Sequence, residues 1–167
     1  MRNLSLLTDL YELTMMQGFV NSGIHNRKAV FDVFFRQTSD MNYAVCAGLE
    51  QAIDYVTGMH FSDEDIEYLR GLNLFTEEFL QMLKDYKFSG DIYAIPEGTV
   101  VFPSEPLLTV KTTLFEAQLI ETAILNIVNH QTLIATKATR IAHAAKGKPV
   151  MEFGLRRAQN NDYATEN

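Results

Sequence analysis

The sequence has little of several features that mark particular classes of protein. Its 167 residues include one cysteine, Cys46, so no disulfide can form within the chain and a reducing cytoplasm is the expected location. No run of about 18 apolar residues occurs, so no segment is expected to span a membrane. The first residues lack the apolar stretch and small-residue cleavage pattern of a signal peptide, and none is expected.

Positive charge is also scarce, because 14 Lys and Arg stand against 21 Asp and Glu, which gives a net charge of −7. Nucleic-acid-binding domains usually carry a basic excess, so DNA and RNA are not expected partners. The histidines show no HxxxH or HExxH spacing and no cysteine cluster accompanies them, so no protein-ligated metal is predicted. P-loop and GxGxxG patterns are absent too, which excludes the standard nucleotide cradles.

The sequence does contain a mixture of helix and strand patterns, which predicts an α+β fold. Helices are predicted at 8–22, 49–57, from residue 62 and at 76–86, and strands at 29–36, 43–47 and three times within 91–112. Asp9 with Glu12, and Ser62 with Asp65, match the capping box that begins many helices. Proline and glycine between the last three strands indicate tight turns.

A long helix is predicted from about residue 114 to 145, with Gly147 and Pro149 preventing its continuation. Its apolar side is expected to carry Ile120, Ile124, Ile127, Ile134, Ala138 and Ile141. Its polar side is expected to carry Glu121, Asn129, Thr132, Thr136, Thr139, Arg140 and His143. The pattern therefore predicts one apolar face and one polar face, with cationic groups near the C-terminal end of the helix.

Residues 150–154 form a short apolar run that predicts a buried strand, and Arg156 and Arg157 follow it directly. A strand end is a common place for a ligand site in α/β structures, and arginine suits bidentate recognition of carboxylate or phosphate. Phe153 lies three residues before Arg156, so a ring face and a cation would together suit a small aromatic acid. The alternative is that both arginines are surface charges and Phe153 is a core side chain.

Other candidate side chains have equally simple structural explanations. Tyr11 lies in the first predicted helix, where it would be an ordinary half-buried aromatic. Arg36 ends a predicted strand, and Arg140 lies near the C-terminal end of a helix, where a cation complements the helix dipole without any ligand. Cys46 lies in an apolar run and is predicted to be a core thiol.

A set of short motifs stands in a fixed order along the chain. They are residues 8–15, 34–36, 47–50, 96–106, 121–126, 134–140 and 152–159. Taken together, these motifs resemble the nicotinate phosphoribosyltransferases, a type II phosphoribosyltransferase family, and the resemblance covers residues 4–159.

The resemblance implies an N-terminal α+β domain at residues 1–147, followed at 148–167 by the first strand of an incomplete α/β barrel. After Gln159 the chain departs from the family pattern and continues with a polar stretch to residue 167. The family's phosphorylatable histidine, and the acidic residues that hold the ribose of phosphoribosyl pyrophosphate (PRPP), would lie beyond that point. No histidine of this chain therefore inherits a catalytic role, and we expect an N-terminal fragment whose own activity is doubtful.

In function, the resemblance implies an enzyme of NAD salvage with glycosyltransferase and ligase character. The family condenses nicotinate with PRPP to give nicotinate mononucleotide and pyrophosphate. It couples this step to hydrolysis of ATP to ADP and phosphate, and Mg²⁺ accompanies the phosphates. Its active site lies at a dimer interface, so a cytoplasmic homodimer is expected.

The resemblance also assigns roles to residues. It implies that the pyridine ring lies between Phe153 and Tyr11, with the tyrosine donated by the second subunit. Arg156 would bind the nicotinate carboxylate, and Asp9 would orient the donated edge. The candidates for phosphate oxygens are Arg36, Arg157, Arg140 and Lys137.

Two alternatives remain open from the sequence. The chain would be a catalytically silent folding or dimerisation module if the missing barrel is essential. A quinolinate phosphoribosyltransferase-like enzyme would share the Pro96-Glu97-Gly98 region and the Ile-Ala-Thr pattern of the long helix. It would lack the Thr-Asp-Leu-Tyr opening at residues 8–11.

Overall fold

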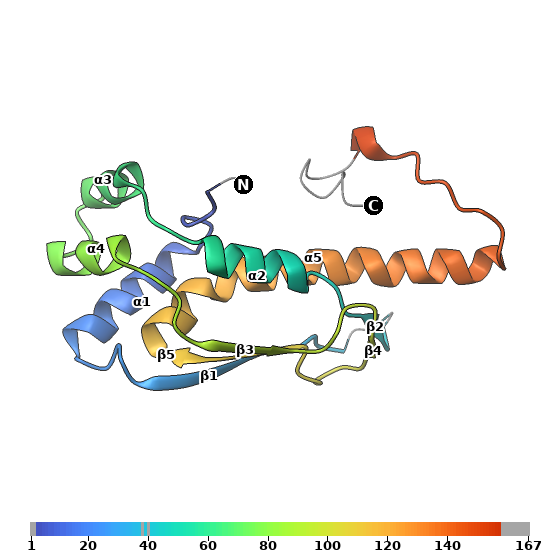
Figure 1. The fold of residues 1–167 in the computed structure, drawn as a ribbon, viewed down its shortest axis with the longest axis horizontal. Coiled ribbons are helices and arrows are strands. Elements are labelled where there is room, and N and C mark those ends of the chain that lie inside the picture. The colour runs from blue at the N-terminus through green and yellow to red at the C-terminus, as the bar shows by residue number, and fades with distance from the viewer. Residues whose placement is uncertain (1–2, 38, 40, 158–167) are drawn as a thin grey trace. The chain divides into compact units, whose positions relative to one another are not determined.

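A computed structural model describes residues 3–37, 39 and 41–157. The elements, in order, are α1 (Leu10–Asn21), β1 (Lys28–Val33), β2 (Ala44–Val45), α2 (Leu49–Gly58), α3 (Asp63–Gly71), α4 (Glu77–Lys84), β3 (Asp91–Ala94), β4 (Val100–Val101), β5 (Leu108–Thr113), α5 (Leu114–Ala145) and a 3₁₀ turn (Leu155–Arg157) (Figure 1). This mixture of helices and short strands confirms the predicted α+β class. No helix in the described part of the chain is long and apolar enough to cross a membrane.

The chain forms two compact units, Met1–Thr136 and Lys137–Asn167. The boundary falls within α5, whose bounds agree with the predicted long helix. The domain boundary predicted at 147/148 rests on the family resemblance and stays a prediction.

Two small antiparallel sheets belong to the first unit. In the larger sheet, β1 and β3 flank β5, with Phe31 and Ile92 on either side of Val110. Figure 1 shows α2 and the first half of α5 on one side of this sheet. Val110 is accordingly buried while the next residue, Lys111, is exposed, as expected for strands with one face on the core. The smaller sheet pairs β2 with β4.

The core of the first unit draws apolar side chains from all five helices. It includes Leu13 and Met16 of α1, Val56 of α2, Leu69 of α3, Phe79, Leu80 and Leu83 of α4, and Ile120, Ile124 and Ile127 of α5. Phe79 stacks on Phe75 with ring centroids 5.2 Å apart and meets Phe115 edge-on at 5.9 Å. Cys46 is buried, which confirms the predicted core thiol.

The two predicted capping boxes had different outcomes. The box at α3 is confirmed, because Ser62 N donates to Asp65 Oδ2 at 2.8 Å and Asp65 N donates to Ser62 Oγ at 3.2 Å. The box at α1 is wrong, since Asp9 is the N-cap residue but its side chain makes no capping bond. Glu12 is instead fully buried, and its Oε2 accepts a hydrogen bond from the hydroxyl of Thr8, the residue before Asp9.

The prediction for the faces of α5 is confirmed near its start and wrong farther along. The isoleucines at 120, 124 and 127, which were assigned to the apolar face, are buried in the core. Thr132 and Thr136 were assigned to the polar face, yet both are buried, whereas Ile134 is half-exposed. Hydroxyl groups can be buried here because the backbone around β2 satisfies them.

The buried strand predicted at 150–154 is wrong. These residues form no regular element, and the side chains of Met151 and Phe153 are 87% and 84% exposed. A strand needs a neighbouring strand to pair its backbone N–H and C=O groups, and no described segment supplies one. The alternative in which Phe153 is a core side chain is wrong for the same reason.

Candidate functional site

The turn between β2 and α2 is held by a carboxylate that lies far away in the sequence. Glu97 Oε1 accepts hydrogen bonds from Gly48 N at 2.6 Å and from Leu49 N at 2.7 Å. The first N–H groups of a helix have no intrahelical partner, so this carboxylate does the work of an N-cap side chain. Gly48 has no side chain for that purpose and adopts φ 100°, in the left-handed region.

The same turn is fixed from the other side by α5. Thr136 Oγ1 accepts a hydrogen bond from Val45 N at 2.9 Å, and Thr132 Oγ1 both accepts from Ala47 N and donates to Ala47 O. A Cβ atom on Gly48 would lie 3.2 Å from the backbone of α5. Three motifs that are separate in the sequence, at 47–50, 96–98 and in α5, therefore form one rigid corner.

Asp9 and Tyr11 lie together at the start of α1, beside acidic side chains. Both side chains are exposed. The pKa of the Tyr11 hydroxyl is raised, and the negative charge of Glu121 in α5 makes the largest contribution. Burial raises the pKa of Glu121 itself, and the charges of Glu12 and Asp9 raise it further. The predicted pair thus belongs to an acidic edge made by α1 and α5. Sequence reasoning placed Glu121 in a family motif and on the polar face of the helix, but did not assign it to the site.

Arg36 lies just after β1, in a segment tied to the turn that precedes β5. Phe35 O accepts a hydrogen bond from Ser104 N at 3.0 Å, and Val33 O accepts one from Leu107 N at 2.7 Å. The Arg36 side chain is exposed. The backbone on which it stands is therefore fixed, while the guanidinium group is available to a ligand.

The second unit brings Phe153 and Arg156 together. The guanidinium carbon of Arg156 lies 5.6 Å from the centre of the Phe153 ring, and its Nη1 donates to Phe153 O at 3.1 Å. Arg157 is exposed on the same 3₁₀ turn. Lys137 and Arg140 lie on the part of α5 that belongs to this unit, and both are exposed. The predicted pairing of a ring with a cation is thus present on one short segment.

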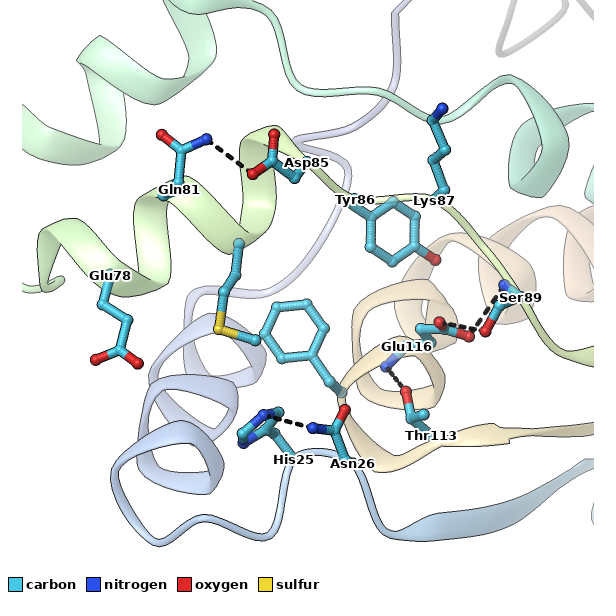
Figure 2. A pocket seen from close by; sticks show the side chains of 12 residues that line it. His25, Asn26, Glu78, Gln81, Asp85, Tyr86, Lys87, Ser89, Thr113 and Glu116 are labelled. Carbon is cyan, nitrogen blue, oxygen red and sulfur yellow. Dashed lines mark hydrogen bonds between the residues drawn. The ribbon is translucent and has the colours of Figure 1, made fainter.

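A hollow of about 570 Å³ lies elsewhere in the first unit (Figure 2). Its wall comes from α4, the residues after α4, the segment before β1 and the start of α5. Glu116 is held there by Ser89, whose hydroxyl donates to it at 2.8 Å and whose N–H donates at 3.2 Å. Its lining includes none of the predicted substrate or phosphate ligands.

Metal-ligating side chains do not gather in the described part of the chain. No group of three or more His, Cys, Asp or Glu side chains there is placed to hold a metal ion. Nothing in this geometry therefore assigns a metal ligand.

The fold is shared with solved structures. A crystal structure of human nicotinic acid phosphoribosyltransferase matches with a TM-score of 0.83 and 33% identity, over 95% of this chain and 32% of that one. A nicotinate-nucleotide pyrophosphorylase from Pyrococcus furiosus matches with a TM-score of 0.71 and 25% identity, over 94% of this chain and 33% of that one. The chain is therefore an α+β domain of the class found in enzymes of nicotinate nucleotides.

Sequence comparison narrows the class to one family. The family model for the nicotinate phosphoribosyltransferase N-terminal domain matches residues 6–129, and the chain belongs to that family. It is 48% identical to nicotinate phosphoribosyltransferase of Bacillus subtilis over 97% of this chain and 33% of the relative. It is 43% identical to pncB2 of Mycobacterium tuberculosis over 96% and 35%. The resemblance seen in the motifs is confirmed, and the chain spans about a third of the length of these curated relatives.

Proposed function

We propose that this chain acts in NAD salvage as the N-terminal part of a nicotinate phosphoribosyltransferase. The reaction joins nicotinate to the ribose of PRPP, releases pyrophosphate and is coupled to ATP hydrolysis. Family membership supports this proposal, together with identities above 40% to relatives that carry this name. We further propose that residues 1–147 are the N-terminal domain and that 148–167 begin a barrel domain.

The observation that carries the proposal is the exposed pair of Phe153 and Arg156. The pyridine ring of nicotinate is flat and electron-poor, so an open aromatic face holds it well. Its carboxylate matches the fork of N–H donors on a guanidinium group. In the proposed complex Arg156 exchanges its bond to Phe153 O for the carboxylate, which keeps the cation at the edge of the bound ring.

The second face of the pyridine is assigned to Tyr11 from a second copy of the chain. Tyr11 is half-exposed although its helix is anchored in the core by Leu13 and Met16. A firmly held helix that presents an open ring suits a stacking partner at a dimer interface. Asp9, two residues earlier and also exposed, would orient this edge.

The exposed cations would serve the phosphate groups. Departure of pyrophosphate leaves positive charge on the ribose and negative charge on the leaving group, so catalysis is mostly positioning and charge stabilisation. The assigned side chains are Arg36, Arg157, Arg140 and Lys137. ATP and Mg²⁺ are expected from the resemblance, but the described residues offer no metal-ligand cluster, so we assign none of them to these groups.

The proposed function is tested by release of pyrophosphate from nicotinate, PRPP and ATP. The assay compares this chain with a chimera in which the Bacillus subtilis relative supplies the remaining two thirds. We expect turnover from the chimera and none from the chain alone. Turnover by the chain alone would reject the silent-module alternative, and an inactive, folded chimera would reject the proposal.

The role of Arg156 is tested in the same chimera. Removal of the carboxylate-binding donor by Arg156→Ala should raise KM for nicotinate roughly 10- to 100-fold, because a charge-assisted hydrogen bond is lost. Glu152→Ala, on the same segment, is the matched control and should leave KM unchanged. Unchanged KM in Arg156→Ala would remove this residue from the site. Competition by nicotinamide and quinolinate in this assay separates the proposal from the quinolinate alternative.

The silent-module alternative has one specific observation in its favour. Residues 150–154, which would start the barrel, form no strand in the described structure, and Phe153 is open to solvent. A site whose aromatic face lies on an unpaired segment is not preorganised for catalysis. The pyrophosphate-release assay on the chain and the chimera distinguishes the silent module from the proposed enzyme.

A further inference from the structure

The hollow beside α4 combines apolar surface with an excess of negative charge (Figure 2). Of the described residues that line it, three are carboxylates, one is a lysine and one is a histidine, namely Glu78, Asp85, Glu116, Lys87 and His25. Met82, Tyr86 and Phe115 add apolar and aromatic surface to the same wall. The volume of about 570 Å³ is within the range of small-molecule sites. The hollow therefore suits a ligand that carries positive charge on an apolar body.

Glu116 is the carboxylate that is buried in the wall of this hollow, with 9% of its surface exposed. Its hydrogen-bond donors are the hydroxyl and the N–H of Ser89 and the hydroxyl of Thr112, all of which are uncharged. None of the ion pairs formed within residues 3–37, 39 and 41–157 involves Glu116. The start of α5 offsets part of its charge, but buried charges in proteins are as a rule also paired. A cation from outside the chain would supply that pairing.

The neighbouring side chains are placed to complete a site for such a cation. Figure 2 shows Glu78 on α4, across the hollow from Ser89 and Glu116. The Tyr86 hydroxyl points toward Glu116, and no described protein group bonds to it, so its oxygen can accept a hydrogen bond from a ligand (Figure 2). The side chain of Lys87 extends away from Glu116 (Figure 2). Negative charge therefore lies on two sides of the hollow.

We propose that the hollow binds a small aliphatic diamine, with one ammonium group at Glu116 and Tyr86 and the other at Glu78. An ammonium group donates up to three hydrogen bonds and accepts none, so carboxylate and hydroxyl oxygens are suitable partners. The methylene chain between the two charges lies against Met82 and Phe115, where it leaves water. The lining includes none of the residues assigned to nicotinate or PRPP, so this inference does not rest on the proposed function.

Isothermal titration calorimetry with putrescine, cadaverine and hexamethylenediamine tests the site. We expect at least one of these diamines to bind one to one, and hexanediol, which has a similar chain without charge, not to bind. Glu116→Gln should raise the Kd about 10- to 100-fold, because a buried charge-assisted hydrogen bond is lost. Glu78→Gln should raise the Kd about 2- to 5-fold, because Glu78 is exposed and its attraction is screened by solvent.

Glu64→Gln is the matched control, because Glu64 is an exposed carboxylate on α3 that does not line the hollow, and its Kd should not change. The amide NMR spectrum of the unaltered chain gives a second measurement that does not need Glu116→Gln to fold. Adding the diamine should shift the signals of Ser89 and Glu116 most. Absence of binding by all three diamines, an equal rise of Kd in Glu64→Gln and Glu78→Gln, or shifts centred elsewhere would each overturn the proposal.

Discussion

Apolar side chains behave differently in the two units of the molecule. In the first unit they come from all five helices and are buried against one another, as Phe79 is between Phe75 and Phe115. In the second unit Met151 and Phe153 lie in an apolar run but are open to solvent. Apolar side chains are therefore buried only where other segments supply a surface for them to pack against.

The largest difference in stability between the two units is expected when a phenylalanine ring is removed from each of them. Phe79→Ala should lower the free energy of unfolding by about 3–5 kcal/mol, because it leaves a cavity among packed rings. Phe153→Ala should change it by less than about 0.5 kcal/mol, because its ring is in water. Urea denaturation followed by far-UV circular dichroism measures both. Similar losses in the two variants would mean that Phe153 is packed in solution.

Much of the fold could be predicted because its signals are local. The bounds of α5 follow from helical periodicity and from the glycine at 147, whose φ is 79°. The capping box of Ser62 and Asp65 needs only residues three apart. The strand at 150–154 could not be judged in this way, because a strand exists only with a partner and that partner is not local in sequence.

The candidate site was predicted less completely for the same reason. The motifs at 47–50 and 96–98 were found separately, but no local rule says that Glu97 reaches Gly48, 49 positions away. Helical periodicity placed Thr132 and Thr136 on a polar face, and only the fold shows that backbone around β2 satisfies their hydroxyls.

A smaller loss of stability is expected from removing either of two carboxylates, one in each unit, that accept hydrogen bonds from backbone N–H groups. Glu97 accepts from two N–H groups at the start of α2, and Glu97→Ala should destabilise the chain by about 1–2 kcal/mol, as loss of an N-cap does. Glu152 Oε2 accepts from Gly154 N at 2.7 Å on an exposed segment, so Glu152→Ala should cost less than about 0.5 kcal/mol. Equal costs by urea denaturation would contradict this view of the two units.

The smallest change in stability is expected for a carboxylate at the acidic edge of the first unit, and this change depends on pH. Burial raises the pKa of Glu121 in the folded chain, so folding favours the protonated carboxyl, and its ionised form lowers stability at pH 7. Glu121→Gln should therefore raise the urea midpoint at pH 7, and the gain should vanish below the ordinary pKa of 4.5.

Asp63→Asn should shift the urea midpoint in the opposite direction. The hydrogen bond from Lys84 lowers the pKa of Asp63, so the ionised carboxylate stabilises the folded chain at pH 7. The variant should therefore be less stable at pH 7, and its loss of stability should disappear as the pH falls through the folded-state pKa of Asp63. Urea-midpoint shifts of the same sign in both variants would mean that exposed charge, rather than burial, determines the contribution of Glu121 to stability at the edge where Tyr11 lies.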